Sequence, residues 1–565
     1  MAPLFKMLEA TFELFVPLVM ADIIDVGIAN GDRPYIYGKV CILVALGIVG
    51  LASSLTAQFF AAKAATYSAA SIRSELYAHI QKLSFRQLDQ VGTSTMITRL
   101  TADAAQVQNG INMILRLLLR SPFIVFGAMI MAFTVDVSGA MIFVVTIPLL
   151  AIVVGVIMGL TIPLYKKVQG GLDRVLSGTR ENLAGVRVIR AFAKEESETE
   201  VFGQRNEELT GLQLKVGRIS ALMNPLTFVL INVATLLIIY IGGVRVNIGL
   251  LTTGQVVALV NYMSQILVEL IKLANLIILT NKTIVSSRRI ASVLDIPIEE
   301  KEVDEGAMKR AMESEPSVEL RHVSLRYSEG ADEALSDVSI CARAGETIGI
   351  IGGTGSGKSS VVNLIPGFYP ASRGEVLVCG ENVGQLSNAF LGKLIGIVPQ
   401  KAVLFRGSIR ENLTMGMVDL PSDEELWDAL EKAQAKEFVM EKEGRLDFQI
   451  AQGGKNLSGG QKQRLTIARA LVRNPGILIL DDSASALDYA TDAALRAAIR
   501  SLPEKPITFI VSQRTSSMLN ADRILVLDDG EVAGVGTHEQ LLESCKVYKE
   551  IYDSQFGGEV SSDAG

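Results

Sequence analysis

The sequence predicts an α-helical membrane domain of six transmembrane helices with long cytoplasmic extensions, followed by an α/β domain. Hydrophobic residues make up 49% of the 565 residues, and the long apolar runs all fall in the first half. A chain of this length exceeds what a single hydrophobic core usually accommodates, so two domains are expected. The second half has the mixed, charged composition of an ordinary globular domain.

Six runs of mostly apolar residues are each long enough for a helix to cross a hydrocarbon core of ~30 Å. Long loops follow the second and fourth runs and carry most of the Lys and Arg residues of this half, so the positive-inside tendency places these loops and both termini in the cytoplasm. The six runs lie near residues 4–26, 37–62, 114–134, 138–164, 223–246 and 254–281. The expected divisions of the chain are 1–298 (membrane domain), 299–315 (solvated linker), 316–556 (α/β domain) and 557–565 (flexible tail).

The two long loops keep helical periodicity, so they are expected to continue the membrane helices into the cytoplasm. Two segments are expected at their tips, namely Gly92–Met96 and Gly185–Phe192. Each is either a solvated helical turn or a point at which the membrane domain touches the second domain.

Three polar residues of the last apolar run, Asn261, Gln265 and Glu269, recur every four positions and therefore share one face of a helix. Polar groups inside a membrane are costly and usually face a water-filled cavity or a partner helix. This stripe is therefore a candidate lining of a path for a substrate. The alternative, packing between helices through hydrogen bonds, stays equally open. Glu9 and Glu13 form a similar pair in the first run.

Charge and cysteine content exclude other classes of protein. The net charge is −7, and no dense cluster of basic residues provides a face for nucleic acid. The four cysteines are far apart in the sequence and form no CxxC pair, so neither a disulfide framework nor a zinc site is indicated.

A phosphate-binding loop is indicated by Gly352–Ser359, which fits the pattern GxxxxGK[ST] and follows the apolar strand Thr347–Ile351. Glycines allow backbone N–H groups to surround phosphate oxygens at the start of a helix. In this pattern Lys358 reaches the outer phosphates of a nucleotide and Ser359 ligates Mg²⁺.

A second apolar strand, Gly476–Leu480, ends in Asp481. Parallel sheets bind ligands at the carboxyl ends of their strands, so Asp481 is expected beside the phosphate loop and in the shell of the Mg²⁺ ion. Between the two strands, Leu457–Arg464 has a glycine pair that opens a helix, and this arrangement provides a second anion-binding helix start.

With these motifs in this order, the chain resembles a half-transporter of the ATP-binding-cassette (ABC) exporter family, whose signature is the LSGGQ run beginning at Leu457. The resemblance implies that the second domain is an α/β P-loop ABC ATPase that binds ATP and Mg²⁺. It also implies an adenine-stacking role for Tyr327, a Q-loop role for Gln400 as a catalytic residue and a ligand of the Mg²⁺ ion, and a D-loop at 485–488.

The resemblance further implies a head-to-tail dimer in which each ATP lies between the phosphate loop of one subunit and the signature of the other. It also makes Gly185–Phe192 similar to a segment that couples the membrane domain to the ATPase. The implied nucleotide contacts of this chain's own loop are Gly352, Gly353, Thr354, Gly355, Ser356, Gly357, Lys358, Ser359 and Ser360. Those implied for the partner's nucleotide are Ser458, Gly459, Gly460, Gln461 and Asp488.

Three places depart from the family pattern, one of which is Gln452–Gly454 before the signature, where the family usually has Glu-Arg-Gly. Asp482 stands where the family usually has a glutamate as general base, and Gln513 stands where it usually has a histidine. A base must come within about 2.6–3.2 Å of the proton that it removes, and the shorter acid has less reach. The three histidines, at positions 79, 322 and 538, lie elsewhere in the sequence. Because general acid–base catalysis contributes roughly 10²–10⁴-fold, the sequence predicts an ATP site that hydrolyses slowly.

This pattern resembles the degenerate-site subunit of bacterial heterodimeric multidrug exporters, which pump hydrophobic or amphipathic small molecules across the cell membrane. The expected partner is a second half-transporter whose competent site is completed by the signature of this chain. Three alternatives stay open, namely a slow homodimer that uses Asp482, a lipid flippase and an ATP-gated regulatory protein.

Overall fold

The computed structural model describes residues 1–299, 301–328, 330–483 and 487–556. Ser485 and Ala486 of the expected D-loop and the expected tail 557–565 lie outside these residues. The chain forms two compact units. The first contains Met1–Gln81 and Ser94–Pro297, and the second contains Lys82–Thr93 and Ile298–Gly565.

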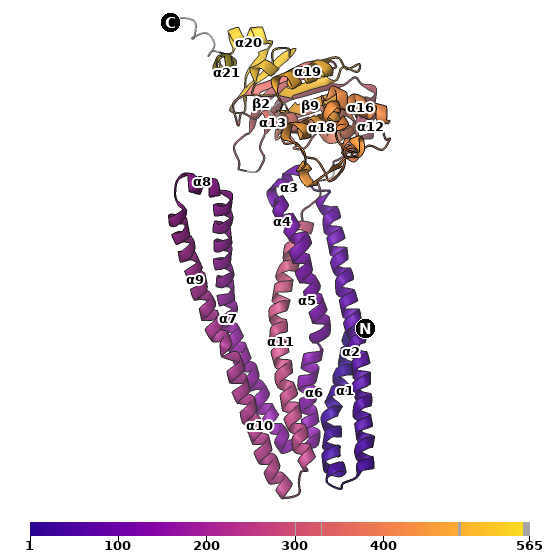
Figure 1. Cartoon of the computed structure of the whole chain (residues 1–565), viewed down its shortest axis with the longest axis vertical. Helices are drawn as coiled ribbons and strands as arrows, with labels where there is room; N and C mark the ends of the chain where they lie inside the picture. Colours follow the sequence, from indigo (N-terminus) through magenta and orange to yellow (C-terminus); the bar gives the residue numbers. More distant parts are fainter. Residues whose placement is uncertain (300, 329, 484–486, 557–565) are drawn as a thin grey trace. The chain divides into compact units, whose positions relative to one another are not determined.

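The first unit is entirely helical within the described residues, and its longest helices run nearly the whole length of the unit (Figure 1). Its core is formed by side chains such as Phe143, Leu259 and Tyr262, which come from helices α7 and α11. The helices are α1 Ala2–Asp22, α2 Arg33–Ile80, α4 Thr93–Thr98, α5 Ala104–Leu117, α6 Arg120–Val135, α7 Val137–Ala184, α8 Val186–Ala191, α9 Glu195–Ala221, α10 Met223–Asn247 and α11 Thr253–Leu294.

Five helical stretches of the described chain are long and apolar enough to cross a membrane. They are Arg33–Ile80, Thr93–Val135, Val137–Ala184, Glu195–Asn247 and Thr253–Leu294. The six expected spans are therefore confirmed only in part. Helix α1, which covers the expected first span, has 21 residues but carries Lys6, Glu9 and Glu13 and is not among the five.

The expected span over 114–134 is interrupted, because helix α5 ends at Leu117 and α6 begins at Arg120. Pro122 has no N–H group, so it cannot donate to the carbonyl of Leu118 four residues earlier. Helical hydrogen bonding resumes one residue later, where the N–H of Phe123 donates to Leu119 at 3.2 Å. The interruption brings the polar residues at the start of α6 into the interior of the unit.

The long loops form helical extensions, as their periodicity predicted. Helices α2 and α7 each contain 48 residues, which corresponds to about 72 Å at 1.5 Å per residue and exceeds twice the thickness of a hydrocarbon core. Helices α7 and α9 pack side by side, and the short helix α8 joins them at one end (Figure 1). Helix α8 lies inside the expected tip Gly185–Phe192.

The other tip differs from the expectation by one short helix. Helix α3, Phe85–Val91, precedes the expected segment Gly92–Met96 and is packed within the second unit. Ser84 begins α3 with a capping box, and Gly92 ends it with a φ of +79°, a conformation that favours glycine.

The second unit contains two main sheets that enclose a shared apolar core. The six-stranded sheet has the order β12-β11-β3-β10-β9-β6, in which only β12 is antiparallel to its neighbour, and the four-stranded sheet is antiparallel with the order β2-β1-β4-β5. The strands are β1 Ser317–Leu325, β2 Leu335–Arg343, β3 Thr347–Gly352, β4 Arg373–Val378, β5 Glu381–Asn382, β6 Ile395–Val398, β7 Gly407–Ser408, β8 Gln449–Ile450, β9 Ile477–Asp481, β10 Ile507–Val511, β11 Arg523–Asp528 and β12 Glu531–Gly536. The helices besides α3 are α12 Glu305–Glu313, α13 Lys358–Leu364, α14 Asn388–Leu394, α15 Ile409–Leu413, α16 Asp423–Lys432, α17 Lys436–Met440, α18 Gly459–Leu471, α19 Tyr489–Arg500, α20 His538–Ser544 and α21 Lys546–Phe556.

The expectation of a purely solvated linker over 299–315 is wrong for its second half, which forms helix α12. Asp304 caps this helix by accepting a hydrogen bond from the N–H of Gly306 at 2.8 Å. Ala307 and Ala311 are buried, and Ala311 belongs to the core of the second unit. Because alanines are small, the sequence pattern hid a helix whose inner face is made of short side chains.

Candidate functional site

The candidate site lies where four parallel strands of the six-stranded sheet end. Strands β3, β10, β9 and β6 are neighbours in that order, so the segments that follow them meet at one edge of the sheet. These segments carry the phosphate loop after β3, Gln513 after β10, Asp482 after β9 and Gln400 after β6. The topology therefore assembles residues that lie up to about 160 positions apart in the sequence.

The phosphate loop has the backbone shape that its glycines permit. Gly355 and Gly357 have φ values of +87° and +90°, which non-glycine residues rarely adopt. At Gly352, a Cβ atom would come within 2.1 Å of the carbonyl oxygen of Leu527, so a larger residue does not fit there. The Nζ of Lys358 donates to the carbonyl oxygen of Gly352 at 2.9 Å and also bonds that of Gly353. The lysine is therefore positioned inside the loop, where phosphate oxygens would lie.

Ser359 and Asp481 are in direct contact, as the Mg²⁺ prediction requires. The Ser359 hydroxyl donates to the Asp481 carboxylate at 3.0 Å. These are hard oxygen donors of the kind that Mg²⁺ prefers, so the pair fits the ion. Burial, together with the charge of Asp482, raises the pKa of Asp481, and burial lowers the pKa of Lys358. Ser359 and Asp481 would hold Mg²⁺, whose charge would offset part of the negative charge of the ATP phosphates.

Asp482, the expected general base, lies at the same edge. The side-chain amide of Gln400 donates to the Asp482 carboxylate at 3.3 Å. Asp482 has a φ of +45°, a left-handed conformation that aspartate tolerates better than most side chains. Two of the expected catalytic residues, Gln400 and Asp482, therefore adjoin each other.

These residues line one cavity of about 340 Å³. Tyr327 lies on its wall, with its hydroxyl 2.8 Å from the Ser360 hydroxyl. The Gln513 side chain also lines the cavity, while its carbonyl oxygen accepts a bond from Gln555 at 2.7 Å. The cavity lining is Tyr327, Ala334, Thr354, Gly355, Gly357, Lys358, Ser359, Ser360, Gln400, Asp481, Asp482, Val511, Ser512 and Gln513.

The signature residues do not line this cavity. Ser458 caps helix α18 in a capping box, in which its hydroxyl accepts from the N–H of Gln461 at 3.3 Å and the Gln461 side chain accepts from the N–H of Ser458 at 3.1 Å. Gly459 begins α18 and Gly460 follows it. Asp488 likewise caps α19, through a bond from the N–H of Thr491 at 2.7 Å. The start of α18 is thus an ordered group of N–H donors outside the chain's own nucleotide cavity.

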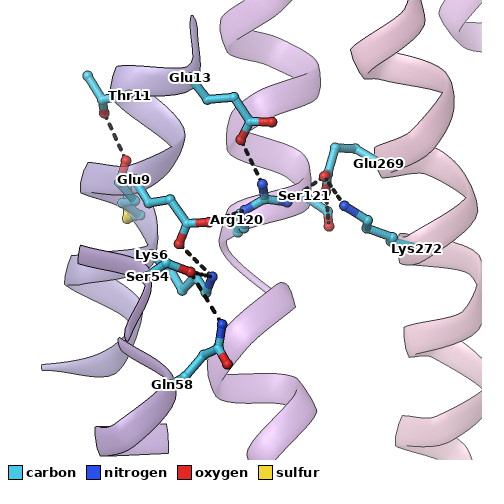
Figure 2. A network of polar contacts seen from close by, with 11 residues as sticks. Lys6, Glu9, Thr11, Glu13, Ser54, Gln58, Arg120, Ser121, Glu269 and Lys272 are labelled. Atoms are coloured by element: carbon cyan, nitrogen blue, oxygen red, sulfur yellow. Dashed lines mark hydrogen bonds and ion pairs between the residues drawn. The ribbon is translucent and has the colours of Figure 1, made fainter. Parts of the chain in front are cut away.

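The polar stripe of helix α11 is divided between two environments. Asn261 is exposed and Gln265 is half-buried, whereas the Glu269 side chain is only 3% exposed. Figure 2 shows Arg120 of α6 between Glu13 and Glu269. Glu269 therefore supports the alternative of packing between helices, and Asn261 and Gln265 remain the accessible part of the stripe.

The network around Glu269 joins four helices of the first unit. The Glu269 carboxylate accepts bonds from Arg120, from the Ser121 hydroxyl at 2.7 Å and from Lys272 at 2.9 Å. Arg120 also donates to Glu13 of α1 at 2.7 Å. Lys6 of the same helix bonds Glu9 at 2.5 Å and Ser54 of α2 at 3.0 Å. The network contains three acids and three bases, so its formal charges balance, which reduces the cost of burying them.

Several residues of these sites were missed by the sequence reasoning, and Ser512 and Arg120 are the most informative of them. Ser512 lines the nucleotide cavity and directly precedes Gln513, so its place at the end of strand β10 was the available signal. Arg120 is a base in a mostly apolar stretch that also contains Pro122. An intramembrane charge of that kind was itself the signal for a buried acidic partner.

A fused helical membrane unit and a P-loop nucleotide cavity define the class of protein as a membrane transport ATPase. Residues 1–270 match the family model described as ABC transporter transmembrane region, and residues 335–485 match the model described as ABC transporter. A Bacillus subtilis protein named Uncharacterized ABC transporter ATP-binding protein YfiB is 36% identical over 98% of this chain and 95% of its own length. The chain belongs to the ABC transporter family.

Two further similarities extend over the whole chain. A Yersinia pestis protein named ATP-dependent lipid A-core flippase is 28% identical over 97% of this chain and 94% of its own length. A solved structure of a bacterial Atm1-family ABC exporter with ATP bound has a TM-score of 0.79 and 22% identity, and the match covers 98% of this chain and 97% of that one. This last similarity shows that the two chains share a fold.

Proposed function

We propose that this chain is one subunit of a heterodimeric ABC exporter that uses ATP to move hydrophobic or amphipathic small molecules out of a bacterial cell. Its own phosphate loop and Asp481 bind an ATP that is hydrolysed slowly, and its signature completes the working site of a second half-transporter. The proposal includes six membrane spans, with α1 as the first, and a cytoplasmic ATPase domain.

The observation that carries this proposal is the chemistry of the nucleotide cavity. Asp482 and Gln513 both line it, in the places where a general base and a titratable switch residue are expected. A glutamine amide can donate and accept hydrogen bonds, but it does not take up a proton near neutral pH. The cavity therefore keeps the residues that bind phosphate and Mg²⁺, but its general base is an aspartate, one methylene shorter than the usual glutamate.

Two surfaces of the chain support the proposal that it requires a partner subunit. The start of helix α18 presents ordered N–H donors outside the chain's own cavity, so its anion-binding capacity serves a nucleotide held by another subunit. Helix α8 and the residue after it expose apolar side chains, with Val188 at 60% and Phe192 at 72% exposure. Exposed apolar side chains of this kind favour a contact with another subunit.

The test compares two substitutions in a complex of this chain with its candidate partner subunit. Lys358→Ala disables the chain's own site, and Ser458→Ala weakens the site completed for the partner. A heterodimer with a degenerate site keeps most of its ATPase activity in Lys358→Ala and loses most of it in Ser458→Ala. In a homodimer both substitutions act on every site, so equal losses would falsify the division of labour.

The isolated chain provides the second measurement. We expect only slow ATP hydrolysis by the purified chain in lipid nanodiscs, and Asp482→Glu should raise the rate if reach is the defect. Because Asp482 has a positive φ, the variant's thermal stability must be measured alongside its activity. Fast hydrolysis by the unmodified isolated chain contradicts the proposal and favours the homodimer.

A lipid is the second candidate cargo, because a relative that matches almost the whole chain is named a lipid A-core flippase. ATP-dependent uptake of an amphipathic dye and of a fluorescent lipid into inverted vesicles separates the two cargoes. ATP binding without movement of either compound would favour the regulatory alternative. Replacing the accessible Asn261 and Gln265 with alanine tests whether the polar stripe lines the path, since cargo selectivity should then change without loss of ATP binding.

A further inference from the structure

A continuous set of contacts links the nucleotide cavity to helix α3. The rings of Tyr327 and Tyr369 meet edge to face, with centroids 4.9 Å apart and an interplanar angle of 86°. The Tyr369 hydroxyl donates in turn to the carboxylate of Asp89 on α3. Burial, together with the neighbouring Asp89, raises the pKa of the Tyr369 hydroxyl, so this group stays protonated and remains a donor. One side chain therefore contacts both the cavity wall and α3.

The phosphate-binding loop is joined to the same point through helix α13. This helix starts at Lys358 and ends in a Schellman turn, in which the N–H of Phe368 bonds the carbonyl of Asn363 at 3.2 Å and that of Gly367 bonds Leu364 at 3.0 Å. Gly367 has the positive φ, +70°, that this turn requires. The turn directs Phe368 and the next residue, Tyr369, toward α3.

Helix α3 is therefore held by two neighbouring contacts, one between apolar rings and one through a hydrogen bond to a carboxylate. The rings of Phe85 and Phe368 stack at a centroid distance of 4.4 Å and a tilt of 35°, which is a contact of apolar surfaces. The second contact, between Tyr369 and Asp89, is a hydrogen bond to a charged group and depends on the direction of the tyrosine ring. That direction is in turn constrained by the ring of Tyr327.

We propose that Tyr369 is a positioning residue that couples the binding of adenine at Tyr327 to the position of helix α3. This coupling is independent of the contacts made by the phosphate end of the nucleotide. The inference rests on the proposed role of Tyr327 as the residue that stacks on the adenine of ATP. A base stacked on Tyr327 fixes the orientation of that ring, the Tyr369 ring adjusts to it, and the bond to Asp89 strengthens. In the sequence, α3 lies between α2 and α4.

The proposed coupling must be reciprocal, because the free energy that couples two sites is the same whichever of the two sites is perturbed. If adenine strengthens the docking of α3, docked α3 must strengthen adenine binding by the same factor. A triphosphate without a base engages Lys358 and Ser359 but not Tyr327. The difference between ATP and inorganic tripolyphosphate therefore isolates the part of the signal that passes through Tyr369.

The experiment measures hydrogen–deuterium exchange of peptides covering residues 85–91 in the full-length protein in nanodiscs. The conditions are no ligand, Mg²⁺ with ATP, and Mg²⁺ with tripolyphosphate, each at saturation. We expect ATP to slow exchange in α3 by roughly tenfold more than tripolyphosphate does, the size expected for one hydrogen bond to a charged group. In Tyr369→Phe, which keeps the ring but loses the hydroxyl, this difference should disappear.

Controls separate the relay from general damage. Tyr552→Phe removes a tyrosine hydroxyl elsewhere in the ATPase unit and should leave the difference intact. Asp89→Ala should match Tyr369→Phe, and the double variant should be no worse than either, since both remove the same bond. Tripolyphosphate affinity should be unchanged in all of them, which shows that the phosphate loop is still folded.

The inference is overturned if Tyr369→Phe keeps the full difference between ATP and tripolyphosphate, or if the unmodified protein shows no difference. Failure of the proposed function looks different, because slow hydrolysis, the partner subunit and the cargo do not enter this measurement. If ATP does not protect the region around Tyr327 at all, the adenine assignment itself is wrong. Exchange in the Tyr327 peptide is recorded in the same experiment.

Discussion

Arg120 contacts three acids from two helices, Glu9 and Glu13 of α1 and Glu269 of α11, and its replacement by methionine is the most direct test of the network in the membrane unit. The Arg120 side chain is 8% exposed and that of Glu269 is 3% exposed. Removing one member of a buried ion pair costs about 3–5 kcal/mol, because the other charge is left buried. Glu269 keeps its bonds to Ser121 and Lys272 in the variant, so the lower end, about 3 kcal/mol, is expected.

A double-mutant cycle isolates the pair. Glu269→Gln alone leaves Arg120 with Glu13, and the double variant Arg120→Met/Glu269→Gln leaves neither charge of the pair buried. The double variant should therefore be more stable than the sum of the single effects predicts, with a coupling of roughly 1.5–3 kcal/mol. Lys272→Met is the matched control, since this lysine contacts the same carboxylate but is 41% exposed, and it should cost at most about 1 kcal/mol.

The assay is equilibrium unfolding in detergent mixtures, followed by far-UV circular dichroism. Fluorescence is unsuitable for this unit, because the only tryptophan, Trp427, lies in helix α16 of the ATPase unit. Strictly additive single effects, or a loss below about 1 kcal/mol in Arg120→Met, would refute the view that the pair stabilises the packing of α1, α6 and α11.

Three further predictions concern the ATPase unit. Lys358→Ala should weaken ATP binding by roughly tenfold to a hundredfold, measured with a fluorescent nucleotide, because bonds from a charged donor are lost; unchanged affinity contradicts the phosphate-loop geometry. Ser359→Ala should abolish the gain in ATP affinity on adding Mg²⁺ but not binding without the ion, since its hydroxyl contacts Asp481. The backbone N–H of Thr491 holds the pKa of Asp488 below its usual value, so the capping charge stabilises helix α19 above the unfolded-state pKa, and this contribution is lost as the pH falls through the lower folded value. Asp488→Asn should therefore match the unmodified protein near neutral pH and lose less stability on acidification, while Asp488→Ala should unfold earlier near neutral pH, with a difference that shrinks on acidification, when followed by Trp427 fluorescence.

The nucleotide site was predictable because its signals are local. A loop that surrounds phosphate needs glycines at fixed positions, so its pattern is visible in the sequence. The strands that lead to Gly352 and Asp481 are continuous apolar runs, which is typical of buried parallel strands. The parallel arrangement then follows from general rules for such sheets. Asp482 and Gln513 were recognised from their positions relative to these motifs, and the structure places both in the same cavity.

The membrane unit was predicted less completely, because hydropathy gives the length of a helix and not its contacts. The break before Arg120 depends on Pro122, and the interruption matters only because Glu269 from a distant helix lies beside it. The spacing of the polar residues in the sequence places them on one face of α11, but in the structure Asn261 is exposed, Gln265 is half-buried and Glu269 is buried. Neighbouring helices decide which of them become buried.

The sequence by itself determined the order of domains, the phosphate loop, the Ser359 and Asp481 positions that meet in the structure, the LSGGQ run and the aspartate after Asp481, since each depends on residues close together in the chain or on a strand followed by a known motif. Only the tertiary structure decided that Arg120 pairs with Glu13 and Glu269, that α3 rather than Gly92–Met96 contacts the turn after α13, and that Tyr369 lies between Tyr327 and Asp89. These contacts join residues more than a hundred positions apart, in most cases. Their free energy depends on burial and orientation, which a linear pattern does not encode.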